Sequence, residues 1–182
     1  MTTTDILLIL VIVALVAWRL STAAGRLDRV HIRRDRARRS LFIQLASRTS
    51  AAARLVTLGV LPNDAAEKLS FVIEKVAVES VHDLSDYISA ESDLTQALGE
   101  IFDDSNFVAS LTQNSNAQMI ISELSDSCKR VSLARRFHND AVGAAQLLHK
   151  RKAVRYLRLA GNTALPQTID MDDSVPRGLE DV

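Results

Sequence analysis

An apolar run near the N-terminus is the feature that most constrains this chain of 182 residues. From Ile6 to Trp18 the sequence reads ILLILVIVALVAW, thirteen residues without a charge. At about 1.5 Å per residue, a helix from Ile6 to Ala24 is roughly 28 Å long, close to the ~30 Å hydrocarbon core of a bilayer. The run therefore predicts a transmembrane helix within residues 1–24. Its predicted anchor residues are Ile6, Leu10, Val13, Val16, Trp18 at the aromatic belt and Arg19, which snorkels.

A cleavable signal peptide and a buried core helix are the alternatives for this run. A secretion signal carries positive charge before its apolar region, whereas residues 1–5, MTTTD, contain no Lys or Arg. Thr22, Ala23 and Ala24 nevertheless resemble a small-residue cleavage site, so this alternative stays open. A core helix of a globular protein has an apolar period on one face, and this run has none.

The charges that flank the run predict an orientation. Ten arginines lie between Arg19 and Arg54, and no basic side chain precedes Ile6. Because cytoplasmic flanks of membrane spans are enriched in Lys and Arg, we expect the N-terminus outside and the rest of the chain in the cytoplasm. The expected localisation is the plasma membrane, with a single pass.

The remainder of the sequence predicts an all-α fold. Aromatic residues make up only 4% of the chain, which disfavours β-sheet. Leucines recur at multiples of seven in the first long helix, at Leu20, Leu27, Leu41 and Leu55. Gly59, Pro62 and Asn63 supply a helix stop and a new start. We expect the transmembrane helix to continue into an antiparallel bundle of three to four long helices.

The predicted domains follow from this pattern. The bundle covers residues 25–160, and an acidic tail, extended or disordered, covers residues 161–182. Further helices are expected near residues 63–81, 91–102 and 117–148. The polar segment from Ser80 to Ser92 fits either a loop or a helix.

Charge is segregated along the chain although the net charge is zero. Residues 19–54 and 127–160 are basic, whereas residues 55–126 and 161–182 are acidic. The acidic middle can fold back on the basic segments, each block can face a different partner, or the faces are simply solvated. One basic face, predicted to contact anionic lipid head groups or a partner, consists of Arg26, Arg29, Arg33 and Arg36.

The sequence contains no recognised catalytic or metal-binding motif. A single cysteine, Cys128, excludes a disulfide framework, and the four histidines form no metal-ligand motif. The chain is therefore predicted to be no enzyme and to carry no cofactor or metal. A hydrolase using His138 and Asp140 is a weaker alternative, because positions i and i+2 of a helix point apart. Nucleic acid is not an expected partner, since no recognised module surrounds the basic segments.

Residues 134–142, ARRFHNDAV, resemble the closing-helix motif of the LemA family. The matching residues are Arg135, Arg136, Phe137, Asn139, Asp140 and Val142. Residues 32–56 also resemble the helix that follows the anchor in that family. The resemblance implies a single-span protein with a bundle of long helices. The sequence departs from the motif at His138 and Gln146 and lacks the family's basic N-terminus, so the family's topology is not carried over.

A second resemblance combines STAAGRLDR, RRFHNDAV and VRYLRLAG with the acidic tail that follows them. These segments are similar to a group of actinobacterial membrane proteins that includes an accessory factor of the cytochrome bcc–aa3 respiratory supercomplex. The resemblance implies a non-catalytic accessory or assembly subunit whose partners are cytochrome bcc and aa3 subunits. The alternative function is a LemA-like tethered scaffold that binds anionic lipid or a soluble acidic partner.

Overall fold

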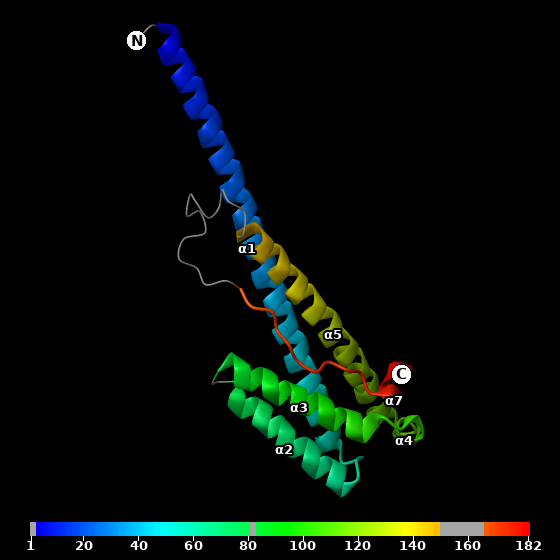
Figure 1. The fold of residues 1–182 in the computed structure, drawn as a ribbon. Helices are drawn as coiled ribbons and strands as arrows, with labels where there is room; N and C mark the ends of the chain where they lie inside the picture. Colours follow the sequence, from blue (N-terminus) through cyan, green and yellow to red (C-terminus); the bar gives the residue numbers. More distant parts are fainter. Residues whose placement is uncertain (1–2, 81–82, 150–165) are drawn as a thin grey trace. The chain divides into compact units, whose positions relative to one another are not determined.

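A computed structural model describes residues 3–80, 83–149 and 166–182 (Figure 1). Within α1 the side chains of a few residues, Val16, Leu20 and Arg26 among them, lie outside the described part. Every element in the described ranges is a helix, which confirms the all-α prediction for this part of the chain. The helices are α1 (Thr3–Leu58), α2 (Asn63–Glu79), α3 (Leu84–Phe102), α4 (Ser105–Leu111), α5 (Ser115–His149) and α7 (Arg177–Glu180).

The chain divides into two compact units, each of which is described by itself. One unit comprises residues 1–37 and 139–168, and it contains the apolar N-terminal run. The other comprises residues 38–138 and 169–182, and it contains the helical bundle. α1 and α5 contribute to both units.

Helix α1 ends where the sequence predicts. Gly59 has a φ of 71°, a left-handed conformation that glycine adopts without the steric cost of a Cβ. Its backbone N–H donates to the carbonyl of Val56 at 3.1 Å, which closes the last turn. Asn63 then begins α2 after a short turn that contains Pro62.

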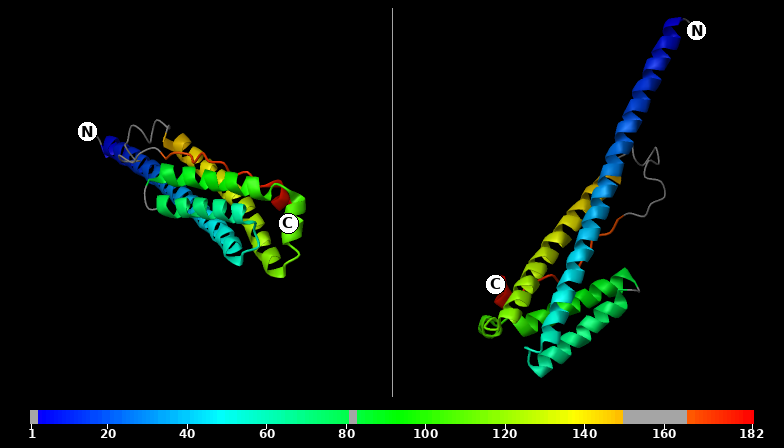
Figure 2. Two further views of the ribbon diagram at one scale, coloured as in Figure 1. Left: turned by 90° about the horizontal axis from the view of Figure 1, so that it is seen from below. Right: turned by 180° about the vertical axis from the view of Figure 1, so that it is seen from behind.

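In the bundle unit, α2 and α3 form an antiparallel pair that packs against α1 and α5 (Figures 1 and 2). Two exposed ion pairs join α2 to α3, Lys68 with Glu100 and Lys75 with Asp93. The apolar faces of all four helices meet in one core. Its buried members include Leu55, Leu69, Val72, Leu94, Leu98, Phe102, Ile121 and Leu124.

Two helical segments extend beyond the sequence prediction. The ambiguous segment before Ser92 is helical from Leu84 onward, so α3 is longer than expected at its N-terminal end. The short helix α4 lies between two of the expected helices, where the sequence predicts none. The Asp104 carboxylate caps its N-terminus by accepting from the backbone N–H of Asn106 at 2.8 Å. The predicted C-terminal end of the bundle at residue 160 lies outside the described residues.

The predicted transmembrane helix is wrong. Among the residues that the structure describes, no helix combines the length and apolarity needed to cross a membrane. The charge-free run of thirteen residues is about 20 Å long as a helix, whereas a bilayer core is ~30 Å thick. The predicted span reached the thickness of a bilayer core only by including Arg19 and residues 20–24, of which Ser21 and Thr22 are polar. The single-pass plasma-membrane localisation and its orientation depended on this span and are corrected with it.

The packing of the core predicts the reactivity of the one cysteine. Cys128 is 2% exposed, and burial raises the pKa of its thiol. We expect a thiol reagent to modify it at least about 100-fold more slowly than an exposed thiol, because reaction requires opening of the core. The matched control is Cys128→Ala/Met119→Cys, since Met119 is 68% exposed on the same helix. Equal labelling rates at pH 8 would contradict this packing.

Candidate interaction site

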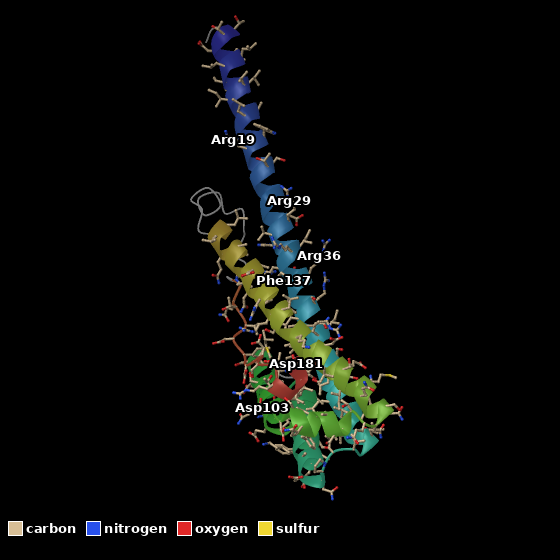
Figure 3. All side chains as sticks on the ribbon, turned by 90° about the vertical axis from the view of Figure 1, so that its right-hand side faces the viewer. Arg19, Arg29, Arg36, Asp103, Phe137 and Asp181 are labelled. Atoms are coloured by element: carbon tan, nitrogen blue, oxygen red, sulfur yellow. The ribbon has the colours of Figure 1, made fainter. Side chains whose placement is uncertain are left out.

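The N-terminal part of α1 exposes apolar side chains on all of its faces. The eight residues from Ile6 to Val13 are all apolar, and each is between 47% and 67% exposed. Successive residues of an α-helix are about 100° apart, so four in a row already cover the whole circumference. Trp18, which is 62% exposed, and the exposed Arg19, which Figure 3 labels, follow at the end of the run.

Such a surface is unusual for a chain on its own. Contiguous exposed apolar patches mark binding surfaces, and a helix that is apolar all round is normally enclosed. Full burial of a Leu, Ile or Val side chain is worth about 1.5–3 kcal/mol relative to exposure. The run from Ile6 to Trp18 therefore offers a large favourable free energy to any partner that covers it.

The predicted basic face follows the apolar run along the same helix. Arg29, Arg33 and Arg36 are exposed, and Arg29 donates from Nε to the carbonyl of Gly25 at 3.1 Å (Figure 3). The side chain of Arg26 lies outside the described part of the chain. Contact of this face with anionic lipid or with a partner stays a prediction.

Some residues of the LemA-like motif in α5 are exposed to solvent, and others are buried. Phe137 is 56% exposed, and Arg136 and Asp140 are also exposed, whereas Val142 is fully buried and Asn139 is half-buried. Arg135 has a specific partner instead. It donates from Nε to Oδ2 of Asp173 at 2.7 Å and from Nη2 to Oδ1 at 3.0 Å.

The weaker hydrolase alternative has no supporting geometry in α5. His138 is 3% exposed, whereas Asp140 is exposed on another face of the same helix. A nucleophilic or acid–base pair needs its two side chains within hydrogen-bond reach. In the described ranges no group of three or more His, Cys, Asp or Glu side chains could hold a metal ion.

A buried ion pair, which the sequence analysis missed, lies at the centre of the bundle. Arg48 of α1 is 1% exposed and Glu91 of α3 is 0% exposed. Nη2 of Arg48 donates to Oε2 of Glu91 at 2.7 Å and to the Glu91 carbonyl at 3.0 Å. Nη1 of Arg48 donates to the Thr95 hydroxyl at 2.8 Å. Nε of Arg48 and Oε1 of Glu91 are buried without a hydrogen-bond partner.

Tyr87 is a half-buried neighbour of this pair. Burial raises the pKa of the Tyr87 hydroxyl, and the nearby Glu91 carboxylate raises it further. The Tyr87 ring stacks on Phe42 with centroids 5.6 Å apart, and the Arg38 guanidinium lies 5.5 Å from the Phe42 centroid. The Arg48–Glu91 pair and the Phe42–Tyr87 stack both join α1 to α3, so these residues hold the two helices together.

Comparisons with known proteins add no relative from which a role could be inferred. No protein-family profile matches the chain, and neither a curated protein nor a solved structure is significantly similar to it. The LemA-like and supercomplex-associated resemblances stay predictions.

The buried pair predicts strong non-additivity of substitutions. Arg48→Met should lower the free energy of unfolding by about 3–5 kcal/mol, because it leaves the Glu91 carboxylate buried without its cation. Arg48→Met/Glu91→Leu removes both charges and should restore most of that loss. Urea unfolding followed by circular dichroism measures both.

The exposed pair of Lys75 and Asp93 is the matched control. Its side chains are 42% and 43% exposed, so Lys75→Met should barely move the unfolding midpoint. Equal effects of Arg48→Met and the double variant would contradict the assignment of a coupled, buried pair.

Proposed function

We propose that this chain is a non-catalytic accessory or assembly subunit of a multiprotein complex, which it joins through its N-terminal helix. The observation that carries the proposal is the exposure of apolar side chains on every face of residues 6–13. The bundle unit, by contrast, has its own buried core, so it does not need the partner for apolar burial.

The partner must surround the helix. Two helices that pack side by side bury one stripe of each, which leaves the rest of the circumference exposed. Ile6, Leu7, Leu8 and Ile9 point in four directions and are each at least 47% exposed. A cleft lined by apolar residues from several helices of the partner would bury all four. Simple pairing of two copies of this helix would not.

The exposed arginines that follow the apolar run indicate which charge the partner carries at the mouth of that cleft. Arg19, Arg29, Arg33 and Arg36 are exposed beyond the apolar residues. Carboxylates at the mouth of the cleft would complement them, and such charge pairs favour one register and faster association. The cytochrome bcc and aa3 subunits, to which the sequence resemblance points, are the partners we propose to test first.

Site-specific photo-crosslinking tests this enclosure directly. Four variants of the chain, each with a photo-reactive residue at position 7, 8, 9 or 10, are expressed in the natural host. We expect all four to crosslink to partner subunits. The control position is Phe71 of α2, which is 69% exposed but outside the run, and it should give no such product. Crosslinking at only one of the four positions would contradict enclosure and indicate one-sided contact.

Charged substitutions in the run should release the partner without unfolding the bundle. Leu8→Asp/Val13→Asp is expected to reduce stoichiometric recovery of partner subunits at least about tenfold, since two carboxylates would have to be desolvated in the cleft. Ile43→Asp is the control, because Ile43 is 64% exposed on the bundle unit. Affinity purification in mild detergent with peptide identification gives the result. Undiminished recovery with the double variant would refute the proposed docking element.

A further inference from the structure

The C-terminal strap, residues 169–180, lies along the bundle as an extended chain that ends in α7 (Figure 1). Its side chains alternate between burial and exposure. Ile169 and Met171 are 6% and 7% exposed, while Asp170 and Asp172 face solvent. The two buried side chains pack in a cluster with residues of α1, α3 and α5, namely Leu41, Leu45, Ile88, Val131 and Ala134.

Side chains of the bundle hold the backbone of the strap at one residue. The hydroxyl of Thr95 donates to the carbonyl of Asp172 at 2.9 Å, and the N–H of Asp172 donates to Oγ of Ser92 at 3.2 Å. Since Thr95 also accepts from Arg48, the strap completes the buried polar network. The bonds to Thr95 and Ser92 fix the register of the strap, because they engage both polar groups of one peptide residue.

A basic group next to this position selects an acidic side chain. Arg135 holds Asp173 through two hydrogen bonds, and the exposed fractions of the two side chains are 22% and 14%. The hydrogen bond to Asp173 raises the pKa of Arg135, and the charges of Asp170 and Asp172 raise it further. Planar, two-point pairing of guanidinium and carboxylate gives geometric as well as electrostatic selectivity.

The far end of the strap fits a slot that admits only glycine. A Cβ at Gly178 would overlap the carbonyl oxygen of Phe102 and lie 2.8 Å from Cγ2 of Val108. The neighbouring Leu179 is fully buried, and its carbonyl accepts from the Ser125 hydroxyl at 2.5 Å. Backbone and side chain at this end are therefore both recognised.

We propose that this groove is a binding site for an extended, acidic segment of a partner protein, and that the chain's own strap fills it in cis. The groove has apolar subsites for alternate residues, a polar anchor for the backbone, a guanidinium for a carboxylate and a slot for glycine. These features would discriminate between segments by the chemistry of their side chains as well as by their shape. Sites that bind extended peptides achieve specificity in this way. The proposal goes beyond docking by the N-terminal helix, because it assigns a second binding surface to the bundle unit.

Competition with the strap makes such a site regulated. A tethered segment acts at an effective concentration of about millimolar, so a free segment of equal affinity displaces it poorly. A partner that carries the same pattern of apolar and acidic residues gains access when the strap is weakened or when a second contact tethers that partner. The groove is thus occupied by default.

The test uses the full-length chain and a fluorescent peptide that corresponds to residues 166–182. In Asp173→Arg the strap repels Arg135, so this chain should bind the wild-type peptide at least about tenfold more tightly than the wild-type chain does. In Arg135→Glu the preference should reverse, with a peptide that carries Asp173→Arg favoured at least about tenfold over the wild-type peptide. Fluorescence anisotropy measures each affinity.

Steric and folding controls complete the test. A peptide with Gly178→Ala should lose binding to both variant chains, because its new methyl group meets the Phe102 carbonyl. Circular dichroism verifies that each variant retains its helices, and the milder Asp173→Asn replaces a chain that does not. Absence of binding to any folded variant, or binding that ignores the charge exchange, would overturn the proposal. Wild-type dimers with exchanged straps would overturn the choice of a different protein as occupant.

Discussion

The buried ion pair of Arg48 and Glu91 is the interaction on which the arrangement of the bundle depends. It joins α1 to α3 at 2.7 Å in a region where neither side chain meets solvent. Desolvation of two charges is expensive, so the pair contributes little net stability by itself. The pair instead favours one alignment of the two helices, because a shift of either helix by one turn would leave both charges buried without a partner. The registers of α1 and α3 are therefore coupled.

The same network determines where the C-terminal strap lies. The Thr95 hydroxyl accepts a hydrogen bond from Arg48 of α1 and donates one to the carbonyl of Asp172. Thr95 therefore links α1 to the strap through two hydrogen bonds. Arg135 and Asp173 then add a second, partly exposed attachment. The bundle unit consequently buries its apolar faces against one another, and its buried polar network is satisfied except at Nε of Arg48 and Oε1 of Glu91. The apolar run at residues 6–18 remains as the large surface that the described residues do not cover.

This contrast explains how the two proposed binding surfaces differ. The N-terminal helix presents unselective apolar area, which gives affinity through burial but little discrimination between partners. The groove under the strap presents a few directional contacts, which give discrimination but are already used in cis. A subunit that assembles with others benefits from both kinds of surface, one for attachment and one for selection.

Much of the helical pattern was predictable from the sequence, because local signals dominate it. Gly59 and Pro62 marked the first boundary, and two of the leucines spaced at multiples of seven in α1, Leu41 and Leu55, are fully buried. The start of α3 was not predictable, since its first turns are polar and acquire their helical structure from packing of residues such as Ile88.

The candidate sites were predictable only in part. Residues 6–18 are recognisable in the sequence as an apolar run. The length of the apolar helix was overestimated, however, and the described residues contain no helix that could span a membrane. Arg48 and Glu91 were overlooked because a charge is normally assigned to the surface, although Arg48 follows Leu41 and Leu45 at inward helical positions. The strap is held by residues far from it in the sequence, such as Thr95, which is 77 positions from its partner Asp172, and no local signal specifies such a contact.

Hydrogen–deuterium exchange on the free chain and on its complex tests the central claim most directly. The account predicts that amides in residues 41–58 are strongly protected in both states, because they belong to the packed core. Amides in residues 6–18 should exchange rapidly in the free chain, since a helix without tertiary packing is marginal in water, and should become strongly protected in the complex. Unchanged exchange in residues 6–18 on assembly would contradict the claim that this helix is the docking element.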